Sequence, residues 1–324
     1  SASIELWLTE GNTEKKIVFS GDIGNKMQPL LKDPEYTAEA DYVVMESTYG
    51  DRLHGERPDY LGQLTQILQE TFDAGGNVVI PSFAVGRTQE ILYFLRQIKE
   101  EKRVAGHENF RVYVDSPLAV EATRIYSAGL TDYYDQETLD LLAKGIDPIA
   151  FRDLRLSVTA DESKLINEDP TPKVILSASG MCEAGRIRHH LKHNLWRPEC
   201  TVCFVGFQSY GSLGRTLLDG AETVKLFGER IAVKAKIVNF HGLSSHADRD
   251  HLLDWIGRFS PTPEHVFVVH GDSEVTELFA NTLNEHNIPA HAPLYEEVYD
   301  LLTNTVAEKG KVLERKSKSG GASA

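Results

Sequence analysis

Four residues of the sequence stand where they could bind a metal ion or exchange protons. Asp22, Glu46, His246 and His270 each lie at or after the end of an apolar, β-rich run. In α/β sheets, the loops at the carboxyl ends of strands converge on a crevice. Asp, Glu and His in such loops are typical of a metal site or an acid/base pair. A single strand-end carboxylate is more often a turn former or helix cap, as we expect of Asp248, so the prediction rests on the set.

Three other segments show the pattern of a strand, a tight loop rich in glycine and hydroxyl groups, and a helix. Backbone N–H groups at a helix start are a natural place for a phosphate. None of the loops is a Walker A motif, because no Gly-Lys-Ser/Thr follows, and each one alone is more typical of a simple turn. The segments are Val78 to Thr88, Leu176 to Met181 and Gly206 to Arg215.

One cluster of the sequence is strongly basic. Within it, Arg186, His189, His190 and His193 have the spacing of residues that share one helix face. A solvated helix face and a docking site for a polyanion are both consistent with this pattern. The cluster consists of Arg186, Arg188, His189, His190, Lys192, His193 and Arg197.

The three cysteines give little sign of chemistry. Cys200 and Cys203 have the spacing of a metal knuckle, but in a strand positions three apart point to opposite faces, so we expect both to pack in the core. An odd number of cysteines in a chain of this length is typical of a reducing compartment, and we expect the cytoplasm.

These residues need an α/β framework, and the sequence predicts one, because β-rich runs alternate with helical patterns. The first two strands are joined through Gly11-Asn12 and predict a hairpin, and hence a mixed sheet. The predicted strands are 4–9, 16–20, 41–46, 77–81, 111–115, 173–178, 201–207, 233–240 and 265–270. The predicted helices are 59–74, 88–100, 136–143, 184–194, 249–259, 273–286 and 294–308.

Composition narrows the classes of function. The chain has 324 residues, of which 41% are hydrophobic, which is enough for about two domains with real cores. A formal net charge of −14 excludes a nucleic-acid partner held mainly by a global basic field, so such a partner needs a local patch. No apolar run approaches the ~20 residues of a membrane span, and no signal peptide is evident, so we expect no membrane association. Residues 309–324 predict a flexible tail.

Several of these motifs, taken in order, resemble the β-CASP branch of the metallo-β-lactamase superfamily, which includes the endonuclease subunit of the cleavage and polyadenylation factor and its bacterial and archaeal relatives. The resemblance covers about residues 1 to 305. The motifs are Phe19-Ser20-Gly21-Asp22, Glu46-Ser47-Thr48-Tyr49-Gly50, Pro81 to Glu90, Ser244 to Asp248 and Val269-His270-Gly271.

The resemblance implies a partial metallo-β-lactamase (αββα) domain with an inserted β-CASP α/β domain. Residues 1–53 and 239–308 would belong to the first, and residues 54–238 to the second. It further implies a zinc-dependent ribonuclease that is endonucleolytic, or that has added 5′ exonuclease activity. A homodimer is also implied, although no particular residue supports it.

The resemblance also assigns roles to residues. Asp22 matches an aspartate that bridges two zinc ions, and His270 matches a histidine ligand. Glu46 and His246 match a hydrogen-bonded pair whose histidine protonates the leaving oxygen. Histidine at the position of His270 is typical of members that act on RNA rather than DNA. The candidates for gripping RNA are Arg87, Ser177, Ser179 and Ser209, with Arg186 and Lys192 further along the groove.

The sequence departs from the family pattern in one large respect. The His-x-His-x-Asp-His motif expected before Asp22 is absent, and of the family's seven metal-ligand positions only Asp22 and His270 are present. Because zinc needs three or four protein ligands, we expect this chain alone to be inactive until a separate N-terminal segment completes the site. The alternative function is a non-catalytic RNA-binding subunit or fragment. A third alternative, hydrolysis of a small ester or lactam, is disfavoured by the phosphate-suited loops.

Overall fold

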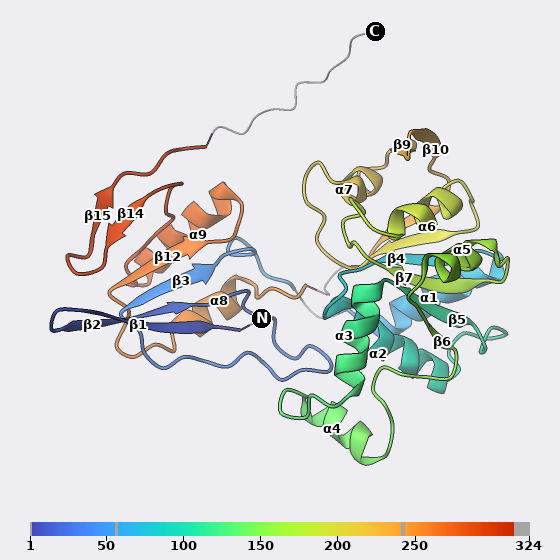
Figure 1. The fold of residues 1–324 in the computed structure, drawn as a ribbon, viewed down its shortest axis with the longest axis horizontal. Coiled ribbons are helices and arrows are strands. Elements are labelled where there is room, and N and C mark those ends of the chain that lie inside the picture. The colour runs from blue at the N-terminus through green and yellow to red at the C-terminus, as the bar shows by residue number, and fades with distance from the viewer. Residues whose placement is uncertain (1, 56–57, 241–243, 314–324) are drawn as a thin grey trace, which may run out of the picture. The chain divides into compact units, whose positions relative to one another are not determined.

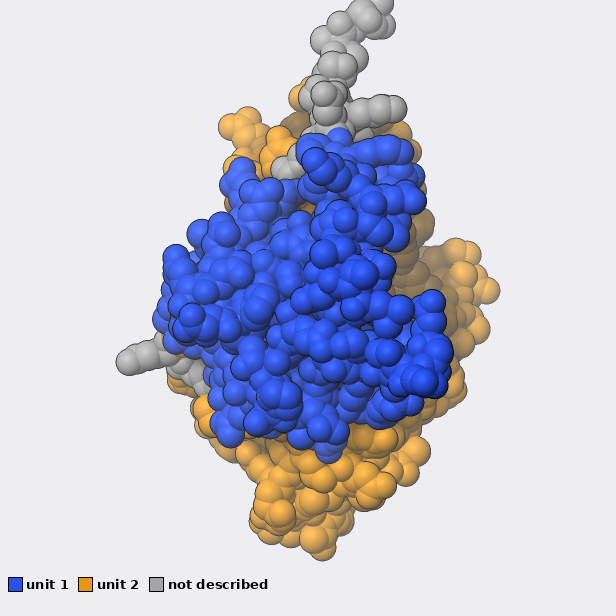
Figure 2. All heavy atoms as spheres, turned by 90° about the vertical axis from the view of Figure 1, so that its left-hand side faces the viewer, with its two compact units in different colours: residues 1–26, 34–54, 245–324 blue, residues 27–33, 55–244 orange. Residues whose placement is uncertain are grey.

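The computed structural model describes residues 2–55, 58–240 and 244–313, and the chain divides into two compact units. Unit 1 consists of residues 1–26, 34–54 and 245–324, and unit 2 of residues 27–33 and 55–244 (Figure 2). The boundaries that we place at 53/54 and 238/239 stay predictions as domain assignments. Of the predicted tail, only residues 309–313 lie within the described part.

Unit 1 contains a mixed five-stranded sheet (Figure 1). The first two strands form the predicted hairpin, and the remaining neighbours pair in parallel. In sheet order the strands are β1 (Ile4–Glu10), β2 (Thr13–Phe19), β3 (Tyr42–Glu46), β12 (His265–Val269) and β13 (Ala290–His291). Two helices, α8 (Arg249–Ile256) and α9 (Ser273–Glu285), and the antiparallel pair β14 (Val298–Asp300) and β15 (Thr305–Glu308) complete the unit.

Strand alternation gives this sheet two apolar faces. Val43, Met45, Val266 and Val268 lie in one core cluster together with residues of α8 and α9 such as Trp255. Their neighbours along the strands, including Tyr42 and Phe267, form a second cluster against Tyr299 and Leu301. The inner strands are therefore held on both faces, which fixes the loops at their carboxyl ends.

Unit 2 contains a six-stranded sheet in which every pairing is parallel. In sheet order the strands are β11 (Lys236–Asn239), β8 (Thr201–Phe204), β4 (Val78–Pro81), β7 (Lys173–Ser177), β5 (Arg111–Asp115) and β6 (Leu154–Ser157). The helices are α1 (Tyr60–Asp73), α2 (Arg87–Glu100), α3 (Pro117–Ser127), α4 (Gln136–Ala143), α5 (Ala160–Glu168), α6 (Ile187–Asn194) and α7 (Leu213–Leu218). A hairpin of β9 (Thr223–Leu226) and β10 (Glu229–Ala232) follows α7.

Helices cover both faces of this parallel sheet, as its buried strands require. Val78 and Ile80 pack in a cluster with residues of α1, α2 and α3, whereas Val79 packs with residues of α5, α6 and α7. The α/β class predicted from the sequence is confirmed, as is the short helix near 136–143.

The helix predicted over 294–308 is wrong, because this segment forms the strands β14 and β15. Leu294, Val298 and Leu301 have helical spacing, but the carboxylate of Asp300 accepts hydrogen bonds from the backbone of Leu302 and Thr303 and closes a turn there. Residue Asn304 completes that turn with a φ of 54°.

No helix within the described ranges is long and apolar enough to cross a membrane.

Candidate metal and acid–base site

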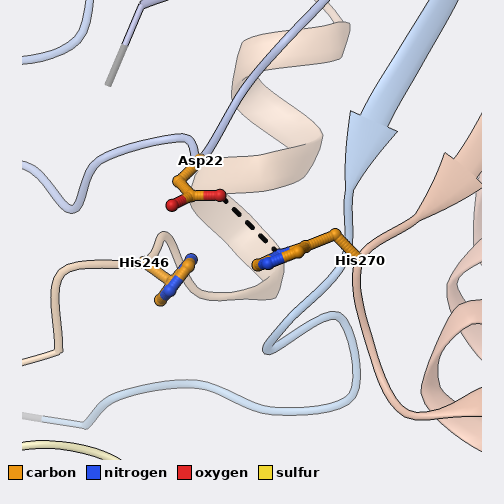
Figure 3. A group of neighbouring side chains, drawn as sticks. All are labelled: Asp22, His246 and His270. Carbon is orange, nitrogen blue, oxygen red and sulfur yellow. Dashed lines mark ion pairs between the residues drawn. The ribbon is translucent and has the colours of Figure 1, made fainter.

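The edge of the unit 1 sheet brings Asp22, Glu46, His246 and His270 together. Strands β2, β3 and β12 are parallel neighbours, so their carboxyl ends meet at one edge. Asp22 follows β2, Glu46 is the last residue of β3, and His270 follows β12. His246 comes from the segment before α8, and Figure 3 shows its ring turned toward Asp22 and His270.

His246 and Glu46 form a hydrogen-bonded pair. The Nδ1 of His246 lies 2.8 Å from Oε2 of Glu46, and the carboxylate of Glu46 is only 1% exposed. A buried carboxylate at this distance holds the imidazole in one orientation and stabilises its protonated form. The second ring nitrogen, Nε2, is then the atom able to exchange a proton with a substrate.

The backbone around His246 is fixed by its neighbours in the fold. Ala247 N–H donates to the carbonyl of Ile23 at 2.8 Å, and His246 forms a β-bridge with Gly24. The ring of His54 lies with Nε2 2.9 Å from the carbonyl oxygen of His246. Asp248 caps α8 through the backbone N–H of His251, which confirms its predicted role.

His270 is held in an uncommon backbone conformation. Its φ is 51°, in the left-handed region that a non-glycine residue adopts only when its surroundings require it. The next residue, Gly271, has no room for a side chain, since a Cβ there would lie 2.7 Å from the Oγ of Ser47. The carbonyl of His270 accepts a hydrogen bond from the Ser47 N–H. Together these contacts turn the His270 ring toward Asp22.

The donor set suits a zinc ion. Oδ1 of Asp22 lies 3.8 Å from Nδ1 of His270, and a ring nitrogen of His246 lies within 4.8 Å of a ligand atom of each. Two ligands of a single ion, at bond lengths of about 2.0–2.2 Å, lie no more than about 4.4 Å apart, a limit that the Asp22–His270 distance meets. Carboxylate and imidazole are among the ligands that zinc prefers. In addition, Oε1 of Glu46 is buried without a hydrogen-bond partner among the described residues.

Thr48 is a site residue that the sequence did not single out. Its Oγ1 donates to Oε2 of Glu46 at 2.6 Å and lies 3.3 Å from Nδ1 of His246 and 3.2 Å from Nδ1 of His270. Its place two residues after Glu46 was the only available signal. Thr48 connects the histidine–carboxylate pair with the second histidine.

The residues predicted to grip RNA lie in unit 2, and several of them already have partners. Arg87 is 4% exposed and forms an ion pair with Glu90. Ser177 is buried and donates to the carbonyl of Asp115 at 2.8 Å. Ser179 donates to the carbonyl of Ala184, and the Oγ of Ser209 lies 3.2 Å from the sulfur of Met181. Their roles in RNA binding stay predictions.

The basic face expected on α6 is divided, because Arg186 and His190 turn inward whereas His189 and His193 are exposed. Arg186 and His190 both bind the buried carboxylate of Asp115, at 2.7 Å and 2.6 Å. Lys192 forms an ion pair with Glu229. The helical spacing was correctly recognised, but Arg186 and His190 share a face because both bind one buried carboxylate. The contact of Arg186 and Lys192 with RNA stays a prediction.

Asp115 is the centre of this cluster. Burial by itself raises the pKa of the Asp115 carboxyl, but hydrogen bonds from His190, Ser163 and Ser157 outweigh burial and lower the pKa to about 2. The carboxylate therefore stays ionised and ties strands β5 and β6 to the segment that leads into α6.

Two family models match the chain. A Beta-Casp domain matches residues 88–217, and a Zn-dependent metallo-hydrolase RNA specificity domain matches residues 230–293.

Curated relatives match over most of the chain. A protein named ribonuclease TTHA0252, from Thermus thermophilus, is 38% identical over 82% of this chain and 58% of its own length. An RNase J-like protein of Methanocaldococcus jannaschii is 31% identical over 86% of this chain and 64% of its own. A transcription termination factor FttA from the same organism is 30% identical over 87% of this chain and 45% of its own length. The chain thus spans about half to two thirds of the length of these relatives.

Proposed function

Because the chain belongs to the β-CASP branch of the metallo-β-lactamase superfamily, we propose that it hydrolyses RNA phosphodiester bonds as a zinc-dependent ribonuclease. The observation that carries the proposal is the convergence of Asp22, Glu46, His246 and His270 at one sheet edge. Relatives named as ribonuclease and RNase J-like protein support RNA as the substrate.

His246 is the general acid of the proposed reaction. A water oxygen forms a bond to phosphorus and releases a proton to the solvent, and the bond from phosphorus to the leaving ribose oxygen breaks. Nε2 of protonated His246 supplies a proton to that oxygen while Glu46, 2.8 Å from Nδ1, stabilises the imidazolium. A positioned acid of this kind typically contributes about 10²–10⁴-fold to the rate.

Asp22 and His270 are the residues that would hold the metal. When bound, zinc activates water and neutralises charge on a phosphodiester. A pair of zinc ions needs more protein ligands than these residues provide, so we propose that a further polypeptide segment supplies the rest.

The test compares the cleavage of two substrates with and without bound zinc. The chain, together with the polypeptide segment that completes its metal site, is incubated with an end-labelled RNA oligonucleotide and with a chromogenic ester, before and after chelation and re-addition of Zn²⁺, while intact mass and zinc content are measured. We expect cleavage of RNA only, its loss on chelation and its return with zinc. The lengths of the products separate endonuclease from 5′ exonuclease activity.

Two variants sharpen this test. His246→Asn should lower cleavage at least about 100-fold without loss of zinc, whereas His286→Asn, on the exposed end of α9, should leave it unchanged. RNA binding without cleavage at any zinc concentration, with the completing segment present, would overturn the enzymatic proposal for this chain. That result would favour the non-catalytic RNA-binding role instead.

A further inference from the structure

Three exposed aromatic side chains on loops of unit 2 have no part in the site or the reaction described above. Phe83 follows β4 and is 47% exposed, Phe207 follows β8 and is 51% exposed, and Tyr210 in the same loop is 96% exposed. Phe204, three residues before Phe207, is fully buried, whereas Tyr133, Trp196 and Phe227 of the same unit are exposed as well. What distinguishes Phe83, Phe207 and Tyr210 is that they lie in segments that follow adjacent strands.

The topology places these loops side by side. Strands β8, β4 and β7 are adjacent and parallel, so the segments after them leave the same edge of the sheet. A Cβ added to Gly180, after β7, would lie 3.3 Å from the ring of Phe83, and one added to Gly206 would lie 3.9 Å from it. The Phe83 ring thus rests against the backbone of both neighbouring loops while half of it remains in solvent.

Hydrogen bonds hold the loops in place. Nε2 of Gln208, a residue only 5% exposed, donates to the carbonyls of Gly180 and Gly206 at 3.0 Å and 3.1 Å. The carbonyl of Phe83 accepts from Oγ1 of Thr88 at 2.7 Å, and Gly214 N–H donates to the carbonyl of Met181 at 3.1 Å. Because the backbone that carries the rings is already ordered, a ligand that stacks on them loses less conformational entropy on binding.

We propose that Phe83, Phe207 and Tyr210 form a stacking platform for the unpaired bases of single-stranded RNA. The inference rests on the proposed function and adds the feature of the substrate that unit 2 recognises. Base stacking on aromatic side chains needs no particular base, because every base has an aromatic face. Ser179 and Ser209 lie in the same loops, and hydroxyl side chains are among the groups that contact a sugar–phosphate backbone.

If the platform exists, the protein should bind RNA that is single-stranded and carries bases, with little preference for sequence. The probes are a fluorescent oligoadenylate, an abasic oligonucleotide of the same length and a duplex RNA. Binding is followed by anisotropy with a chelator present, so that no cleavage interferes. We expect the oligoadenylate to bind at least about 5-fold more tightly than the abasic strand or the duplex, as the stacking of even one base implies.

Variants assign the effect to the rings. Tyr210→Ala and Phe207→Ala should each weaken binding of the oligoadenylate about 5-fold or more and leave binding of the abasic strand unchanged. Tyr210→Phe keeps the ring and should bind like the wild type. Tyr133→Ala is the matched control, because Tyr133 is a 66% exposed tyrosine of the same unit outside these loops.

The outcomes separate this inference from the proposed function. If the wild type cleaves and binds RNA but the abasic strand binds equally well, or if Tyr210→Ala and Phe207→Ala bind as the wild type does, the platform is overturned and the ribonuclease proposal stands. If the wild type binds none of the three probes, both fail. Far-UV circular dichroism of each variant shows that the fold is intact, and the high exposure of Tyr210 makes its replacement harmless to the core.

Discussion

Thr48 lies between the two histidines of the unit 1 site, and its single hydroxyl proton is donated to the buried carboxylate of Glu46. A hydrogen bond to a charged group is worth about 1.5–3 kcal/mol, and Val has nearly the shape of Thr without that donor. We therefore expect Thr48→Val to lower kcat about 10-fold or more and to leave KM nearly unchanged.

Thr48→Ser keeps the hydroxyl and should restore most of that rate. Steady-state cleavage of an RNA oligonucleotide measures both variants. A loss shared equally by Val and Ser would contradict the positioning role, because the hydroxyl that Ser keeps would then not restore the rate.

Glu46 and His246 should behave as one unit in a double-mutant cycle. Their atoms are 2.8 Å apart, so replacing either residue by Ala removes the same interaction. We expect Glu46→Ala and His246→Ala each to reduce cleavage about 100-fold or more, and the double variant to be little worse than the poorer single one. Zinc content should stay constant, and additive losses would show that the two residues act independently.

At the residue scale, candidate site residues could be predicted from the sequence where an ionisable side chain ends an apolar run. Asp22, Glu46, His246 and His270 could be selected because polar residues interrupt apolar runs there, although their roles stay predictions. Thr48 could not be selected, because a threonine after a strand is common. Its importance arises from distances to residues about 200 positions away.

At the scale of elements, Asp115 connects segments of unit 2 that are distant in the sequence. Its carboxylate is fully buried and bound by Arg186, His190, Ser157 and Ser163. Removing one partner of a buried ion pair typically costs about 3–5 kcal/mol. Asp115→Asn should lower the free energy of unfolding of unit 2 by about this amount, as measured by urea denaturation. Asp161→Asn, which alters an exposed pair with Lys164, should change it by less than about 1 kcal/mol.

A second element-scale prediction concerns His265 of β12 and His291 of β13. Nε2 of His265 lies 2.6 Å from Nδ1 of His291, and the His265 ring stacks on Tyr299. Burial, and then the charge of His291, lower the pKa of His265 to about 4, below its ordinary value of 6.5. The unfolded chain therefore takes up a proton at this residue before the folded chain does.

The contribution of His265 to the free energy of unfolding should accordingly be fully present above pH 6.5 and should decrease as the pH falls from about 6.5 to about 4. Hydrogen exchange of the β12 amides, followed across this pH range, would measure the decrease in stability. His265→Leu should show a smaller dependence on pH than the wild type, and equal slopes would contradict the assignment.

The elements themselves were predictable to different degrees. Continuous β-branched runs such as Val78–Pro81 identify buried parallel strands directly. The segment 294–308 could not be assigned correctly, because its helical spacing is overridden by the turn at Asp300 and by the packing of Tyr299 on β12 residues. The inward face of α6 was also hidden, since nothing in the local sequence shows that Asp115 lies beneath it.

At the scale of the whole molecule, the outer strand β1 exposes an apolar row. Ile4, Leu6 and Leu8 lie on one face of this edge strand and are 58%, 42% and 45% exposed. Exposed apolar edge strands promote pairing with other chains. We expect the double variant Leu6→Lys with Leu8→Lys to reduce concentration-dependent self-association, measured by light scattering.

The control for this prediction is Val312→Lys, because Val312 is a 77% exposed apolar residue outside the sheet. Association that persists in the β1 double variant would show that another surface is responsible. The homodimer implied by the family resemblance would then have to be sought on that surface.

The short segment Met27–Asp33 belongs to unit 2, although the residues on both sides of it belong to unit 1. Leu30 in this segment is 2% exposed and lies in the core cluster of α1 and α2. Residues 55–244 are therefore not a self-sufficient cassette. Any recombination event, or any designed chimera, that exchanges this unit between related proteins must transfer residues 27–33 with it, or else leave a hole in the transplanted core. The two pieces are thus expected to be inherited together.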